Sequence, residues 1–144
     1  MDDPFDTGAQ HHLTVERFDA TAIRTRIERD WRVVRIEVES DSSLAFELMF
    51  RDGDESLENR FQFWCDANTG VVDGLVRIHL DDRRLRVALD TEHGASLGFL
   101  SNLFVFELPD GPEAQAALAV VLTWAAAQGR WAIDLDAASF PARA

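Results

Sequence analysis

The stretch WRVVRIEVESDSSLAFELMF, residues 31–50, holds two alternating runs separated by a short polar turn of Asp and Ser. In the first run Val34, Ile36 and Val38 share one face, and charged residues occupy the positions between them. Side chains of a β-strand point alternately to opposite faces, so this period of two predicts a strand with one buried face. Residues 44–50 alternate in the same way, with the Leu and Phe residues on one face and the residues between them on the other. The stretch therefore predicts two consecutive strands of a sheet.

The same period recurs outside this stretch. It predicts strands over residues 13–18, 61–66, 71–80, 84–90, 103–108 and 131–136. Within 71–80 we expect Val76, Ile78 and Leu80 to face the core, and a tight turn should follow at residues 81–83. Residues 19–29 are ambiguous, because Asp19 could cap a short helix there.

One long helix is predicted near the C-terminal end. Pro112 suits its first turn and Gly129 its end, and apolar residues between them recur at helical spacing. Residues 91–98 are expected to add one or two helical turns. The predicted class is α+β, with an antiparallel β-sheet of about six to eight strands and the C-terminal helix packed on it.

The length of 144 residues predicts a single domain. We assign residues 13–136 to one α+β domain, residues 1–12 to a flexible N-terminal lead-in and residues 137–144 to a C-terminal tail. No apolar run approaches the ~20 residues of a membrane span. The acidic start of the chain does not resemble a secretory signal, and a single cysteine cannot form an internal disulfide. A cytoplasmic location is therefore expected.

The charge balance restricts the partners. The sequence has 14 basic residues, all of them Arg, and 26 acidic residues, so the formal net charge is −12. Nucleic acids and anionic membranes require a basic surface, so both are excluded as expected partners. A basic protein partner would be attracted. Solubility alone is an alternative explanation for the excess of acids.

Residue patterns that carry catalysis are absent from the sequence. The eight glycines are scattered without a phosphate-binding motif, and the absence of Lys rules out a Walker lysine or a Schiff base. No spacing typical of a metal site is present, and Cys65 is expected to be a buried small hydrophobe. We therefore expect no enzymatic activity, no cofactor and no metal.

Acidic residues cluster at three places, residues 52–58, residues 81–82 and residues 37–41, and the first two clusters are the candidates for binding a partner. On charge alone, the predicted partner-binding residues are Asp52, Asp54, Glu55, Glu58, Asp81 and Asp82. Their expected location is on two loops between strands. A solvated loop without a binding role is the alternative.

A series of short segments occurs in a recognisable order in the second half of the chain: Trp64-Cys65-Asp66, Val72-Asp73-Gly74-Leu75, Leu85-Arg86-Val87-Ala88-Leu89, Gly94-Ala95-Ser96-Leu97-Gly98, Phe104-Val105-Phe106 and the helix at 112–129. With these segments, residues 63–108 resemble the tenth immunity-protein family of bacterial polymorphic toxin systems, and with the following helix the resemblance extends to about residue 128. Val72 and Asp73 stand where the family has an aromatic residue and its first glycine.

The resemblance implies an immunity protein that binds a cognate secreted toxin domain and neutralises it. A nuclease is one such toxin, and its basic cleft would attract an acidic inhibitor. Two alternatives stay open at this point. A small acidic secretion chaperone would bind an unfolded effector segment, and a ligand-binding α+β barrel would enclose a pocket.

Overall fold

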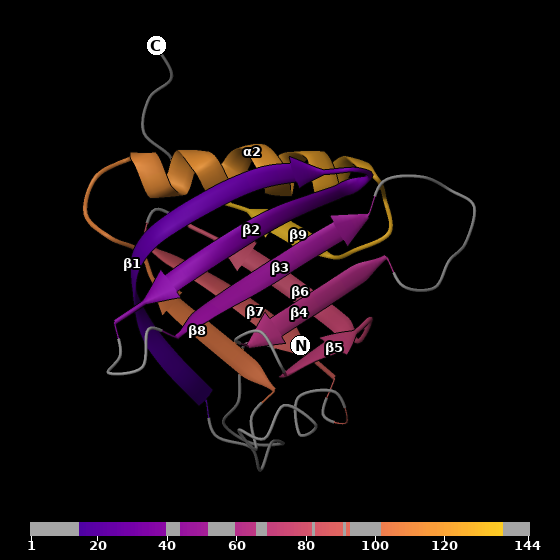
Figure 1. Cartoon of the computed structure of the whole chain (residues 1–144), viewed down its shortest axis with the longest axis horizontal. Helices are drawn as coiled ribbons and strands as arrows, with labels where there is room; N and C mark the ends of the chain where they lie inside the picture. Colours follow the sequence, from indigo (N-terminus) through magenta and orange to yellow (C-terminus); the bar gives the residue numbers. More distant parts are fainter. Residues whose placement is uncertain are drawn as a thin grey trace.

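The computed structural model describes residues 15–39, 44–51, 60–65, 69–81, 83–90, 92 and 102–136. Within these ranges nine strands form one sheet, accompanied by one long helix (Figure 1). The elements are β1 (Val15–Glu28), β2 (Trp31–Val38), β3 (Ala45–Arg51), β4 (Phe61–Cys65), β5 (Thr69–Val72), β6 (Leu75–Leu80), β7 (Arg84–Leu89), β8 (Leu103–Glu107), α2 (Glu113–Ala127) and β9 (Ile133–Leu135). The predicted α+β class is confirmed.

The sheet has the order β5-β4-β3-β2-β1-β8-β7-β6-β9 and is larger than predicted. Most neighbours are antiparallel, but β1 pairs with β8, and β6 with β9, in parallel. Strand β1 belongs to both halves of the sheet, because its first residues pair with β8 and its later residues with β2. The register shifts between Ala20 and Ala22, which bends β1 at this point.

The short helix considered for residues 19–29 is wrong. These residues continue β1 and end in the turn to β2. Asp19 does not cap a helix, because its backbone C=O accepts a hydrogen bond from the N–H of Glu39 at 2.9 Å, beside β2. The long antiparallel pairing with β2 stabilises a strand here, and it outweighs the helical spacing of the local apolar residues.

The run 71–80 is two strands rather than one. Asp73 and Gly74 both adopt a positive φ, 65° and 83°, and break the run between β5 and β6. A second irregularity lies between Leu75 and Arg77, so Val76 is exposed and the prediction that it faces the core is wrong. Ile78 and Leu80 are fully buried as predicted.

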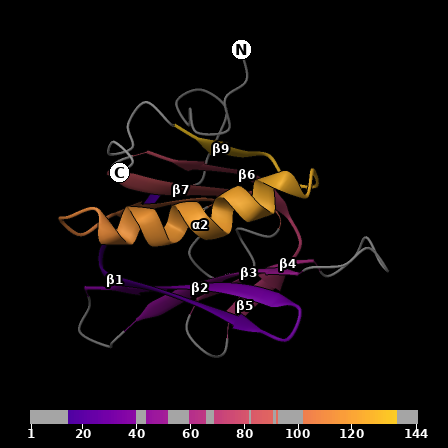
Figure 2. The same ribbon diagram turned by 90° about the horizontal axis from the view of Figure 1, so that it is seen from above.

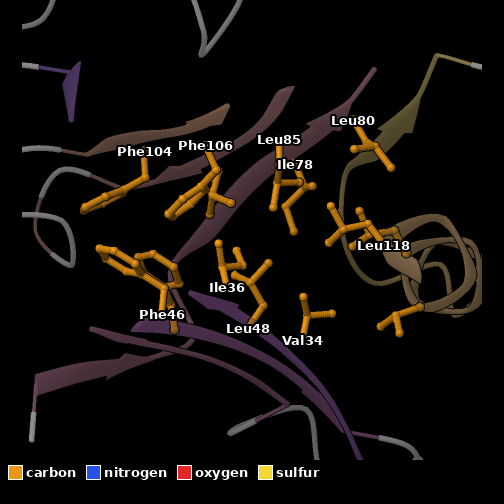
Figure 3. Close-up of a cluster of buried hydrophobic side chains, with 14 of the residues drawn as sticks. Val34, Ile36, Phe46, Leu48, Ile78, Leu80, Leu85, Phe104, Phe106 and Leu118 are labelled. Carbon is orange, nitrogen blue, oxygen red and sulfur yellow. The ribbon is translucent and has the colours of Figure 1, made fainter. Parts of the chain in front are cut away.

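The two halves of the sheet face each other across one core (Figures 2 and 3). Figure 3 shows Phe104 and Phe106 of one half opposite Phe46 of the other. The ring centroids of Phe46 and Phe106 are 5.0 Å apart, and both side chains are completely buried. Aromatic side chains therefore fill much of the space between the halves.

Helix α2 lies over the gap between the halves at one side of the core (Figure 2). It contacts β1, β2 and β9, and it buries Leu118 and Leu122 completely. Pro112 is the N-cap residue, one position before the first turn in which it was predicted. Gly129 follows the C-cap with φ 72°, at the helix end where it was predicted. The predicted lead-in, the C-terminal tail and most of the predicted helical turns at 91–98 lie outside the described residues.

Candidate functional site

Of the six acidic residues predicted to bind a partner, the structure describes Asp81. The other five, Asp52, Asp54, Glu55, Glu58 and Asp82, lie outside the described residues. Asp81 holds the turn between β6 and β7, because its Oδ1 accepts hydrogen bonds from the backbone N–H of Arg83 at 2.8 Å and of Arg84 at 2.9 Å. Its Oδ2 lies 3.7 Å from a guanidinium nitrogen of Arg86. This carboxylate therefore has a structural role in the turn.

The acidic excess is concentrated outside the described strands and helix. The described ranges contain 13 of the 14 arginines but only 16 of the 26 acidic residues, which leaves them a net charge of −3 out of −12. The remaining −9 belongs to segments that the structure does not describe. Four of those acids are the predicted cluster between β3 and β4.

Arginines and glutamates form a connected group of ion pairs on the outer face of β1, β2 and β3. We call it the charged face, and it consists of Arg24, Arg26, Glu28, Arg35, Glu37 and Glu47. Glu37 accepts from Arg24 at 3.2 Å and from Arg35 at 3.5 Å. Glu47 accepts from Arg26 at 3.1 Å and from Arg35 at 3.5 Å. Each of these two glutamates is thus shared by two arginines.

The strand register explains this arrangement. Arg24 of β1 lies directly opposite Arg35 of β2, a pairing that would repel without a counter-charge. Glu37, two residues along β2 on the same face, supplies that counter-charge to both. Val33 on this face is completely buried, and the register places it beside Arg26. The aliphatic parts of long side chains can cover such an apolar residue while their charged ends stay in water.

Two ionisable groups at this end of the sheet have shifted pKa values. Hydrogen bonds to Glu28 and then to Glu47 raise the pKa of Arg26 above its usual value. A hydrogen bond from Arg51, with Nε 3.0 Å from Oδ2, lowers the pKa of Asp30 below its usual value. Both shifts favour the charged forms, so the ion pairs here persist at neutral pH.

An aromatic side chain borders the charged face on β4. The register places Trp64 opposite Glu47, and the indole Nε1 donates a hydrogen bond of 2.8 Å to Oε1 of Gln62. The ring lies over Gly70 of β5, where an added Cβ would come within 2.4 Å of two ring atoms. Gly70 is therefore required for this position of the indole. Trp and Arg are the residues most enriched among the energetic centres of protein interfaces.

The outer face of the other half of the sheet carries separate ion pairs. Arg77 of β6 pairs with Asp134 of β9, and Arg84 of β7 pairs with Glu107 of β8 at 2.7 Å. Exposed single pairs contribute about 0–1 kcal/mol to stability. These two ion pairs therefore contribute little to the stability of the fold, and their main effect is on the distribution of charge over this face.

Metal-ligating side chains do not gather within the residues that the structure describes. No group of three or more His, Cys, Asp and Glu residues there could hold a metal ion. Cys65 is buried, as predicted, with 4% of its surface exposed. In the same ranges, no helix combines the length and hydrophobicity needed to cross a bilayer.

Sequence reasoning placed Glu37 in an acidic cluster with Glu39 and Asp41, but it did not link Glu37 to the arginines of the charged face. The signal was present as alternation, with Arg35 and Glu37 on one face of β2 and Arg24 and Arg26 on one face of β1. The link between them needed the register of β1 against β2, which the ambiguity of residues 19–29 concealed.

Comparisons with protein-family models, with curated proteins and with solved structures found no match to this chain.

Proposed function

We propose that this protein is an immunity protein that binds a cognate secreted toxin domain in the cytoplasm and neutralises it. The charged face is the observation that carries the proposal. Its ion pairs hold long side chains in place before a partner arrives, so less side-chain entropy is lost on binding. The adjacent indole of Trp64 adds a large apolar contact held by Gln62.

The resemblance of residues 63–128 to the tenth immunity-protein family supports this class of function. The overall charge of −12 supports a basic partner, because long-range attraction accelerates the encounter of oppositely charged proteins. A toxin with a basic cleft, such as a nuclease, has this charge. The expected mode of action is steric blockage of the toxin.

The packed core supports a role as a rigid scaffold. Phe46, Phe63 and Phe104 are all completely buried, and the rings of Phe63 and Phe104 lie 5.1 Å apart. A core of this kind holds the strands of the charged face in a fixed register. Rigid partners bind with little rearrangement, as tight protein inhibitors do.

Co-expression tests the proposal. The chain is produced together with the toxin domain encoded by the neighbouring gene, and cell survival and complex formation are measured. We expect survival and a complex that co-purifies, whereas co-expression with an unrelated toxin domain should give neither. Cell death with no complex would refute the proposed function.

A further inference from the structure

The later part of β1 is a free edge of the sheet. Residues 15–19 of β1 pair with β8, and from Ala20 to Glu28 the strand pairs with β2 on one side. The sheet order gives no second strand neighbour to residues 21–28, among the residues that the structure describes. Figure 1 shows this part of β1 at the margin of the front half of the sheet, next to α2. Eight residues make a longer edge than a typical strand of about 5–6 residues.

Side-chain exposure agrees with an open edge. Every residue from Arg24 to Glu28 is exposed, and Ile27 keeps 67% of its surface accessible although it is a large apolar residue. The side chain of Arg24 is 69% exposed despite its ion pair with Glu37. An edge strand leaves backbone N–H and C=O groups available for pairing with another chain.

The side chains along the edge select the kind of strand that could join it. Arg24 and Arg26 project on the outer face, and the intervening positions, among them Ile23 and Ile27, belong to the inner face. Cross-strand neighbours stabilise a pair when opposite charges face each other. A guanidinium has five N–H donors, so an arginine that already pairs with a glutamate can bind a second carboxylate.

The same side chains disfavour several of the registers in which a second copy of this chain could join. When two copies of the edge pair antiparallel about a two-fold axis normal to the sheet, each outer-face residue lies opposite an outer-face residue of the other copy. Registers centred on Arg24, Thr25 or Arg26 each place two arginines directly opposite, whereas registers centred on Ile23 or Ile27 do not. Like charges facing each other destabilise a strand pair, which is a known protection of edges against self-association.

We infer that the free edge at residues 21–28 binds an extended segment of a protein partner whose alternate residues are acidic. The segment adds a strand to β1, with its carboxylates beside Arg24 and Arg26 and its apolar side chains beside Ile27. Main-chain hydrogen bonds supply affinity, and the alternating side chains supply specificity. Where the partner is the toxin domain, this assignment rests on the proposed function. The edge itself does not depend on it.

A synthetic peptide tests the edge without the toxin. An eight-residue peptide of alternating Glu and Val, blocked at both ends, is titrated onto the full chain, and amide hydrogen exchange is followed. We expect alternate amides of residues 21–28 to exchange quickly in the free chain and about tenfold more slowly with saturating peptide. A matched peptide of alternating Lys and Val should give no protection. Absence of protection by the acidic peptide, or equal protection by both peptides, would overturn the inference.

A charge variant adds a second check. Arg24→Glu should weaken binding of the acidic peptide about tenfold, while Arg83→Glu, the same change in the exposed turn between β6 and β7, should leave it unchanged. If Arg24→Glu does not fold, Arg24→Ala serves instead. Equal effects of the changes at 24 and 83 would also overturn the inference. If no complex with the toxin domain forms, the proposed function is refuted and the inference about the edge is not affected. If a complex forms but residues 21–28 stay unprotected in it, the toxin domain is not the partner that binds the edge.

Discussion

Replacing Phe46 with alanine tests how the two halves of the sheet are joined. Phe46 lies on β3 and is completely buried. Four aromatic neighbours of its ring lie among the described residues, with centroid separations of 4.7 Å to Phe18, 5.0 Å to Phe106, 5.7 Å to Phe63 and 6.3 Å to Phe104. Two of these neighbours belong to β8, in the opposite half. The side chain therefore connects strands that are distant in sequence.

The expected loss follows from burial and from the number of neighbours. Truncation of a buried Phe to Ala costs about 3–5 kcal/mol, because the apolar surface is lost and a cavity remains. We expect Phe46→Ala to fall in the upper half of that range, since four ring contacts disappear together. Each aromatic pair contributes about 0.5–1.5 kcal/mol beyond the burial of its surface.

Equilibrium unfolding in urea, followed by circular dichroism and by tryptophan fluorescence, measures the free energy of unfolding. Val120→Ala is the matched control, because Val120 on α2 is 71% exposed and its truncation should change stability by less than about 0.5 kcal/mol. A loss below about 1 kcal/mol for Phe46→Ala would refute the described core. A double-mutant cycle with Phe106→Ala should show a coupling of at least about 0.5 kcal/mol, and strict additivity would contradict contact between the halves.

Three further predictions concern the surface. If the acidic residues at positions 52–58 steer a basic toxin, Asp52→Arg combined with Asp54→Arg should slow association about tenfold at low salt and far less at high salt, as measured by stopped-flow fluorescence. Unchanged rates would exclude these two residues from the encounter. Because the folded-state pKa of Asp30 lies below its unfolded value near 3.8, its ion pair stabilises the fold above that pH and is lost as pH falls through the lower, folded-state pKa. The stability difference between the wild type and Asp30→Asn should therefore be constant from pH 7 to about pH 5 and vanish in strong acid, and an increase on acidification would contradict the ion pair. Gly70→Ala should displace the indole of Trp64, which would change the near-UV circular dichroism, and an unaltered spectrum would contradict the close contact.

Strand alternation predicted much of the fold. The pattern of Val34, Ile36 and Val38 against charged residues placed β2 correctly, and the alternating buried and half-buried positions of Phe61 to Cys65 followed the same rule. Such patterns succeed because one face of each strand must be buried. Pro112 and Gly129 marked the helix for an equally local reason.

Features that depend on distant partners were not predictable in this way. The parallel pairing of β1 with β8 joins residues almost ninety positions apart, such as Val15 and Leu103. The local sequence of residues 19–29 fits both a helix and a strand, and the pairing with β2 decides between them. The exposed Val76 resulted from a register shift that local alternation does not reveal.

The candidate site shows the same division. Composition identified the acidic excess, and Asp81 was correctly placed at a turn. The sharing of Glu37 and Glu47 between arginines of different strands required the register of three strands. Alternation along one strand shows which residues share a face, but it does not show which residues of the next strand lie opposite them.

Titration calorimetry of the purified chain with the purified toxin domain, accompanied by an assay of the toxin's activity, tests the central claim most directly. We predict a one-to-one complex whose affinity falls with added salt and whose formation abolishes the activity of the toxin. A toxin domain that stays fully active with the chain in excess, with no heat of binding, would contradict the assignment as an immunity protein.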